Sequence, residues 1–153
     1  MIKYIATLNQ YSEHPLAEAI VKYGTSKNTS MAKIDDFEAI AGKGVTGTID
    51  GQKIALGNTK LLEQQSASIS DDLKTKVLAE QEQGKTTSYI MVNQKVVGYV
   101  TIYDALKKTS QNAIRELQKA GIDVIMLTGD NQRTAKAVAD QLNLKHYILL
   151  NNT

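Results

Sequence analysis

Two stretches decide the fold of this chain: Ser12-Glu13-His14-Pro15-Leu16-Ala17-Glu18-Ala19-Ile20 and, further along, Gly42-Lys43-Gly44-Val45-Thr46-Gly47. The first predicts the start of a helix, because Ser12 can cap it, Glu13 places negative charge beside free backbone N–H groups, and Pro15 fits the first turn. The second predicts a loop that can approach a bulky or anionic ligand, because glycine allows positive φ and leaves N–H groups uncovered. Together they predict a ligand site made of a helix start and a glycine loop.

The composition is that of an ordinary globular protein. The 153 residues suffice for one domain or two small ones, 42% of them are hydrophobic, and the formal net charge is +2. Lys and Arg are spread along the chain, so no nucleic-acid partner is expected. The absence of cysteine excludes disulfides and thiolate metal sites. No apolar run is long enough for a membrane helix and no signal peptide is evident, so we expect this chain to be soluble.

The first hundred residues predict an antiparallel sheet flanked by helices, an α+β arrangement. Asp50-Gly51 is a strong hairpin signal, and Asn93-Gln94 separates two further β-rich runs. Gly24 is expected to end the helix that begins at Pro15, and Ser70 to cap a later one. The expected helices are 1–10, 15–23, 58–65 and 71–83, and the expected strands are 32–40, 44–49, 53–56, 88–92 and 95–102.

After Asp104 the pattern changes to helix, apolar strand, polar loop and helix. An amphipathic helix is expected over 107–120, a buried strand of the parallel type over 123–127, and another helix over 134–142. This order is Rossmann-like but incomplete. The sequence therefore predicts two domains, 1–100 and 101–153.

Four motifs, in this order and spacing, resemble one family. They are Ser-Glu-His-Pro-Leu-Ala from Ser12, Gly-Lys-Gly-Val from Gly42, Leu-Gly-Asn from Leu56, and Thr-Gly-Asp-Asn from Thr128. Over nearly the whole chain they resemble heavy-metal-transporting P-type ATPases, most closely the copper exporters. The resemblance implies a nucleotide-binding domain over 1–100 and part of a phosphorylation domain over 101–153.

The resemblance also implies where a nucleotide would bind, with ATP or ADP as the ligand and Mg²⁺ accompanying it. His14 would contact the adenine ring, and a set of neighbouring residues would surround the nucleotide. That set is Glu13, His14, Gly42, Gly44, Gly57, Asn58 and Asn9. The loop Thr128, Gly129, Asp130 and Asn131 would lie close to the transferred phosphoryl group, where orienting phosphate oxygens is nearly all that a protein contributes.

Each of these residues also has a plainer interpretation. A histidine before a helix often only packs or caps, a glycine loop is often only a turn, and Asn131 can simply cap the next helix. Gly84-Lys85-Thr86-Thr87 resembles the end of a P-loop but lacks the earlier glycine, so it is expected to be a helix-to-strand loop. Family members commonly have a glutamate at the position of Asn9. The amide of Asn9 lacks the negative charge of glutamate, so its contact with adenine would be weaker.

Two motifs of the family do not occur in the sequence. The Asp-Lys-Thr-Gly-Thr motif with the phosphorylated aspartate is missing, and so is Gly-Asp-Gly-x-Asn-Asp. The chain is therefore expected to bind nucleotide but to form no phosphoenzyme alone, as an excised piece or a truncated product of a longer gene. Its parent would be a translocase that couples ATP hydrolysis to copper export.

Other functions stay open at this point. The chain could be a non-catalytic regulatory or docking module that kept the fold, or the same domain of a zinc or cadmium pump. An independent phosphatase of the haloacid dehalogenase type would need an Asp-x-Asp nucleophile, which the sequence lacks. The expected partners are ATP or ADP and the actuator and membrane domains of the parent pump, and the expected location is the cytoplasmic side of a cell membrane.

Overall fold

The structure is a computed structural model that describes residues 1–12, 15–103 and 106–150. The chain divides into two units, 1–73 with 88–100 and 74–87 with 101–153. Segment 74–87 belongs to the second unit, although it falls within the predicted domain 1–100. The division into functional domains stays a prediction.

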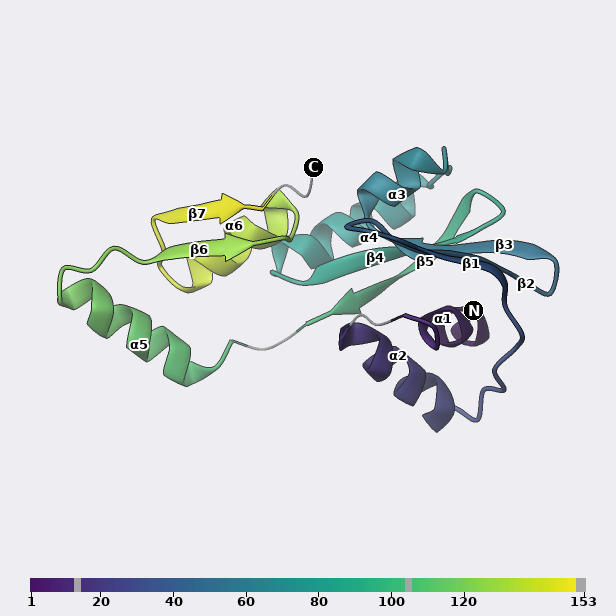
Figure 1. Ribbon diagram of the computed structural model, residues 1–153. Helices are drawn as coiled ribbons and strands as arrows, with labels where there is room; N and C mark the ends of the chain where they lie inside the picture. Colours follow the sequence, from purple (N-terminus) through teal and green to yellow (C-terminus); the bar gives the residue numbers. More distant parts are fainter. Residues whose placement is uncertain (13–14, 104–105, 151–153) are drawn as a thin grey trace. The chain divides into compact units, whose positions relative to one another are not determined.

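A five-stranded sheet in the order β1-β2-β3-β4-β5 is the frame of the first unit (Figure 1). Successive strands from β1 to β4 pair antiparallel, which confirms the predicted fold class. The strands are β1 (Asp35–Ile40), β2 (Gly44–Ile49), β3 (Gln52–Gly57), β4 (Thr86–Val92) and β5 (Lys95–Ile102).

The two predicted hairpins are confirmed, and their turns are alike. Asp50 and Gly51 have φ values of 52° and 75°, and Asn93 and Gln94 have 47° and 62°. Positive φ at both central residues is the type I′ geometry that matches the twist of paired strands.

The predicted start of the first strand at Ala32 is wrong, because β1 begins at Asp35. The backbone N–H of Ala32 donates instead to the buried hydroxyl of Thr7, at 3.1 Å. The segment before β1 is thus held by a helix and not by a neighbouring strand.

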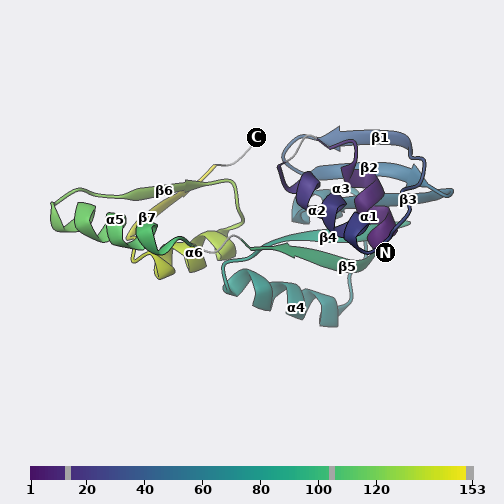
Figure 2. The ribbon, with the colours of Figure 1, turned by 90° about the horizontal axis from the view of Figure 1, so that it is seen from below.

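Helices cover both faces of this sheet (Figures 1 and 2). α1 (Ile2–Asn9) and α2 (Pro15–Ser26) lie on one face, and α3 (Thr59–Gln64) lies on the other. The main core is between α1 and the sheet, where aliphatic side chains are removed from water. Its buried members are Ile5, Leu8, Val45, Ile49, Ile54, Leu56 and Ile90.

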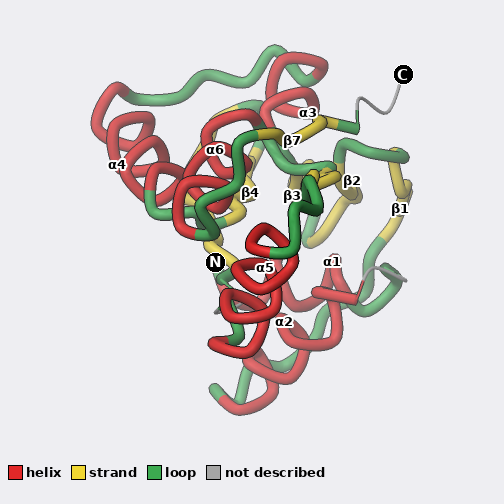
Figure 3. Tube along the Cα trace, turned by 90° about the vertical axis from the view of Figure 1, so that its left-hand side faces the viewer, coloured by secondary structure: helices red, strands yellow, loops and turns green. Residues whose placement is uncertain are grey.

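Gly24 does not end α2, contrary to the prediction, because the helix continues to Ser26. A Cβ atom at Gly24 would lie 2.6 Å from the Cβ of Ala6 on α1. The glycine is therefore needed where the two helices cross, and Figure 3 shows these helices side by side. The left-handed residue that follows the helix is Asn28, with φ of 54°.

The second unit contains a parallel pair of strands joined by a helix. β6 (Ile125–Thr128) and β7 (His146–Leu149) pair in parallel, and α6 (Gln132–Gln141) connects them. This β-α-β order confirms the Rossmann-like portion. The unit also includes most of α4 (Asp71–Glu82) and all of α5 (Lys108–Lys119).

The prediction that the first of these parallel strands is buried is wrong. Ile125 and Leu127 on β6 are 51% and 61% exposed, and Ile148, paired with Leu127, is 50% exposed. α6 buries its own alanines, Ala135 and Ala139. Among the described residues no further strand extends this two-stranded sheet.

We expect Gly24→Ala to destabilise the protein by about 1–3 kcal/mol, because the new methyl group must push α1 and α2 apart. Urea unfolding followed by circular dichroism measures this. Gly129→Ala is the matched control, since no atom lies within 4 Å of a Cβ at that position. Equal stability of the two variants would show that the helix crossing does not depend on Gly24.

Candidate functional site

The structure brings together four of the residues predicted to bind nucleotide. Gly44 at the start of β2 is paired with Gly57 at the end of β3. The side-chain amide of Asn58 donates to the carbonyl of Gly42 at 2.8 Å, and its backbone N–H donates to the carbonyl of Lys43 at 2.9 Å. Two motifs that are separated in the sequence thus form one cluster at the end of the β2–β3 pair where β2 begins and β3 finishes.

The two paired glycines are needed for backbone packing. A Cβ at Gly44, whose φ is +146°, would lie 2.2 Å from the carbonyl oxygen of Leu56 and 2.5 Å from the Cα of Gly57. A Cβ at Gly57 would lie 2.3 Å from the carbonyl oxygen of Lys43 and 2.5 Å from Leu61. This packing requirement exists without any ligand. The sequence analysis missed it, because it explained the lack of side chains at these positions only by the approach of a nucleotide.

Asn58 links the glycine loop to the helix that follows it. Its Oδ1 accepts the backbone N–H of Leu61 at 3.3 Å, so it is the N-cap of α3. Its Nδ2 holds the Gly42 carbonyl at the same time. One side chain therefore sets both the start of α3 and the position of the loop.

Lys43 has a partner of its own, since its ammonium donates to Oε1 of Gln64 on α3 at 2.7 Å. The lysine is thus held against a helix.

Asn9 is buried, and its side-chain amide donates to the carbonyl of Ile5 one turn earlier in α1, at 2.8 Å. That bond uses the side-chain Nδ2, so Oδ1 is the atom of Asn9 that could accept a hydrogen bond from an adenine amino group. The predicted contacts of Glu13 and His14 lie outside the described residues. The distance from His14 to the glycine cluster is therefore not part of this site's geometry.

A hollow of about 260 Å³ lies elsewhere on the sheet. None of the residues predicted to bind nucleotide lines it. Its floor is apolar, with Ala55 and Met91, and its rim carries polar groups. The rim residues are Asp36, Thr46, Thr48, Lys53, Gln65 and Gln94.

In the second unit, the predicted phosphate-side loop follows β6 directly. Asn131 caps α6, because its Oδ1 accepts the backbone N–H groups of Arg133 and Thr134 at 3.0 and 3.1 Å. The plainer interpretation of Asn131 is thus confirmed. The space beside Gly129 is open, since no atom lies within 4 Å of a Cβ built there.

The carboxylate of Asp130 is held by two hydroxyl groups. Thr86 donates to Oδ1 at 2.8 Å and Thr128 donates to Oδ2 at 3.1 Å. The backbone N–H of Asp130 also donates to the Thr128 hydroxyl, at 3.1 Å. The acid is therefore partly buried and oriented by residues on both sides.

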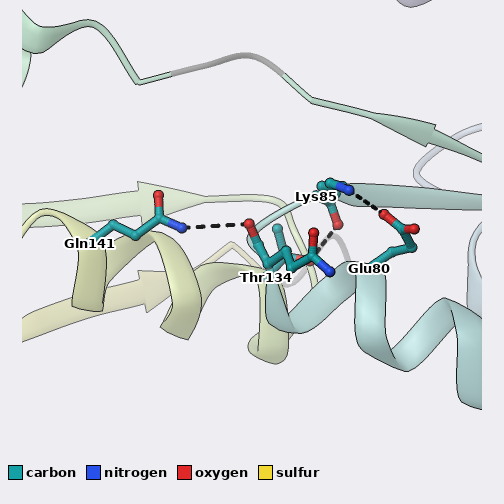
Figure 4. A network of polar contacts seen from close by, with 5 residues as sticks. Glu80, Lys85, Thr134 and Gln141 are labelled. Atoms are coloured by element: carbon teal, nitrogen blue, oxygen red, sulfur yellow. Dashed lines mark hydrogen bonds and ion pairs between the residues drawn. The ribbon is translucent and has the colours of Figure 1, made fainter.

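Thr86 and Thr87 are the first two residues of β4, so only Gly84 and Lys85 of the predicted loop Gly84-Lys85-Thr86-Thr87 lie in the connection between α4 and β4. This loop is bound to α6: the hydroxyl of Thr134 donates to the carbonyl of Lys85 at 3.1 Å (Figure 4). The ammonium of Lys85 pairs with Glu80 at 2.5 Å. Sequence reasoning had no signal that Thr86 reaches Asp130, which is 44 positions away.

The described residues offer little else for metal or membrane binding. Nowhere in 1–12, 15–103 and 106–150 do three His, Cys, Asp or Glu side chains group in a way that could hold a metal ion. Over the same ranges no helix is both long and apolar enough to cross a bilayer.

On α6 the pKa of Lys136 is raised by its hydrogen bond to Asp140. This pair is exposed and does not include any of the predicted site residues.

Comparison with known proteins identifies the family. A family model described as a haloacid dehalogenase-like hydrolase matches residues 1–151. The chain belongs to this family. The pattern Asp-x-Asp, which an independent phosphatase of this type would need, occurs nowhere in the sequence.

Within the haloacid dehalogenase-like family the chain is homologous to copper-exporting P-type ATPases. It is 41% identical over 150 residues to the probable copper-transporting ATPase PacS of Synechocystis, covering 97% of this chain and 20% of that protein. It is 38% identical over 147 residues to a copper-exporting P-type ATPase of Staphylococcus epidermidis, covering 96% and 18%. The chain thus spans about a fifth of the length of these relatives.

Solved structures show the same fold. A zinc-transporting PIB-type ATPase in the E2.Pi state matches with a TM-score of 0.60 and 26% identity, covering 97% of this chain and 23% of that one. The catalytic domain of the CPx-ATPase CopB-B matches with a TM-score of 0.63 and 22% identity, covering 97% and 50%. The fold of this haloacid dehalogenase-like chain is therefore that of a P-type ATPase catalytic domain.

Gly44→Ala should destabilise this chain by about 2–4 kcal/mol, because it combines an unfavourable φ with a collision against the β3 backbone. Gly51→Ala is the control, since Gly51 also has positive φ but open space around it. Urea unfolding of both variants separates the collision from the φ effect. Similar losses in both would contradict the packing role of Gly44.

Asn58→Ala should cost about 0.5–2 kcal/mol through loss of the cap of α3. Asn58→Asp keeps the acceptor for Leu61 but cannot donate to the Gly42 carbonyl. Amide hydrogen exchange then distinguishes the two functions of Asn58: Leu61 should lose protection only in the alanine variant, and the 42–44 loop should become more mobile in both. An unchanged loop in the aspartate variant would show that the Gly42 bond is dispensable.

Proposed function

We propose that this chain binds an adenine nucleotide as the nucleotide-binding part of a copper-exporting P-type ATPase. The observation that carries the proposal is the cluster of Gly42, Gly44, Gly57 and Asn58, formed by two motifs of a chain that is 41% identical to a probable copper-transporting ATPase. Glu13, His14 and Asn9 are proposed to complete the adenine side. Mg²⁺ would accompany the nucleotide.

Thr128, Gly129, Asp130 and Asn131 are proposed to lie beside the phosphoryl group. The open space at Gly129 supports this assignment, because a phosphate needs room. The ordered carboxylate of Asp130 could accept from waters of the Mg²⁺ that would accompany the nucleotide. In a full pump the γ-phosphate would be presented to an aspartate that is absent from this sequence. The isolated chain is therefore expected to bind ATP or ADP and to turn none over.

Copper is proposed as the transported ion of the parent protein, since the curated relatives reported above are named as copper transporters. The actuator and membrane domains of that protein are the proposed partners, and the cytoplasmic side of a cell membrane is the proposed location. The named zinc transporter has a lower identity of 26%. These assignments rest on homology over a fifth of the length of the relatives.

Titration of ¹⁵N-labelled chain with Mg²⁺ and ATP tests the pocket. We expect the amide signals of Gly42, Gly44 and His14 to shift at millimolar nucleotide, and His14→Ala to weaken binding about tenfold, a loss of about 1.4 kcal/mol. His146→Ala is the matched control, because His146 is the other histidine and is exposed on β7.

Signals of Gly42, Gly44 and His14 that stay in place at millimolar ATP would contradict the assignment. The regulatory or docking module would then be favoured. Evidence for such a module would be association with a partner protein that is equally strong with and without ATP.

A further inference from the structure

We propose that Thr86 is a positioning residue for Asp130. Its hydroxyl holds the carboxylate in one orientation, in which a free acceptor position of Asp130 would face the hydrated Mg²⁺ at the phosphate end of a bound nucleotide. The inference rests on the proposed function, in which the loop from Thr128 to Asn131 lies beside the phosphoryl group. It adds to that site the first residue of β4, a strand in which no predicted site residue lies.

The geometry of Asp130 is the first argument. Each of its carboxylate oxygens accepts one hydroxyl, from Thr86 at 2.8 Å and from Thr128 at 3.1 Å. Thr128 is the last residue of β6, so its hydroxyl ties one carboxylate oxygen to the strand directly before Asp130. Thr86 is the first residue of β4, 44 positions away, and its hydroxyl ties the other oxygen to a second strand.

The connection that precedes Thr86 is bonded to α6. Besides the bond between Lys85 and Thr134, the side chain of Gln141 donates to the carbonyl of Gln83 at 3.5 Å (Figure 4). Gly84, with φ of +79°, lies so close to α6 that a Cβ there would be 3.3 Å from Val138. The backbone of the loop is thus attached to α6 on both sides of Gly84.

Thr86 is not required to start α6. Asn131 caps that helix through its own side chain, and the amide of Asn131 also donates to the hydroxyl of Thr134 at 3.0 Å. Removing the Thr86 hydroxyl therefore leaves the helix cap and the anchored backbone intact. What it removes is one of the two donors to Asp130.

An oriented carboxylate has a chemical use at this position. An ionised carboxylate has about four acceptor positions, and the two hydroxyls occupy one on each oxygen. The remaining positions cannot bond phosphate oxygens, which are acceptors themselves, but they could accept from the water molecules of the Mg²⁺ that would accompany the nucleotide. Polar groups that are oriented before the ligand arrives need no reorganisation when it binds.

Three variants of the whole chain test the proposal. Thr86→Val removes the hydroxyl with little change in shape, and Thr86→Ser restores it. Thr87→Val is the matched control, because the hydroxyl of the neighbouring Thr87 accepts from Gln81 at 2.7 Å and does not contact Asp130. Unfolding curves report any general loss of stability in each.

The first readout is the χ1 angle of Asp130 from three-bond NMR couplings without ligand. We expect one rotamer in the wild type, in Thr86→Ser and in Thr87→Val, and an averaged χ1 in Thr86→Val. The second is the Kd for MgATP, which should rise about 2- to 10-fold in Thr86→Val only, while the Kd for adenosine, which has no phosphate, stays unchanged.

A single Asp130 rotamer in Thr86→Val overturns the proposal, and so does an averaged rotamer with an unchanged Kd for MgATP. Failure of the proposed function gives a different result. In that case the amides of Thr128 to Asn131 do not respond to MgATP in the wild type, whatever the rotamer of Asp130.

Discussion

The first unit depends on one close approach of two backbones, where Gly44 on β2 meets Gly57 on β3. A side chain at either position would collide with a carbonyl oxygen of the facing strand, at 2.2 and 2.3 Å. Because the strands meet there, Asn58 can cap α3 and hold the Gly42 carbonyl with the same side chain. The glycine motifs of the family thus have a structural reason that is separate from any ligand.

The second unit is organised in a comparable way around α6. The helix is capped by Asn131, and the connection between α4 and β4 is bonded to its first and last turns through Lys85 and Gln83. This places the hydroxyl of Thr86 on Asp130, so an acidic side chain in a loop becomes ordered by residues far away in the sequence.

Family membership and fold support a nucleotide-binding function in different ways. The haloacid dehalogenase-like family model spans residues 1–151, and the curated copper transporters align over almost the entire chain. The catalytic domain of a CPx-ATPase shares the fold. The copper ion, the pump and its other domains remain proposals, because the chain corresponds to a fifth of those proteins.

The sequence by itself determined the family through four motifs and their spacing. It also determined the antiparallel sheet, both type I′ hairpins and the β-α-β portion, because these depend on local turn residues and on short-range periodicity. Only the tertiary structure decided that Gly24 lies inside α2, since the reason is Ala6 on another helix. It also decided that Ile125 and Leu127 are exposed, because burial of a strand depends on which layers cover it. The contact between Thr86 and Asp130 belongs to the same class, as long-range packing leaves no periodic signal in a sequence.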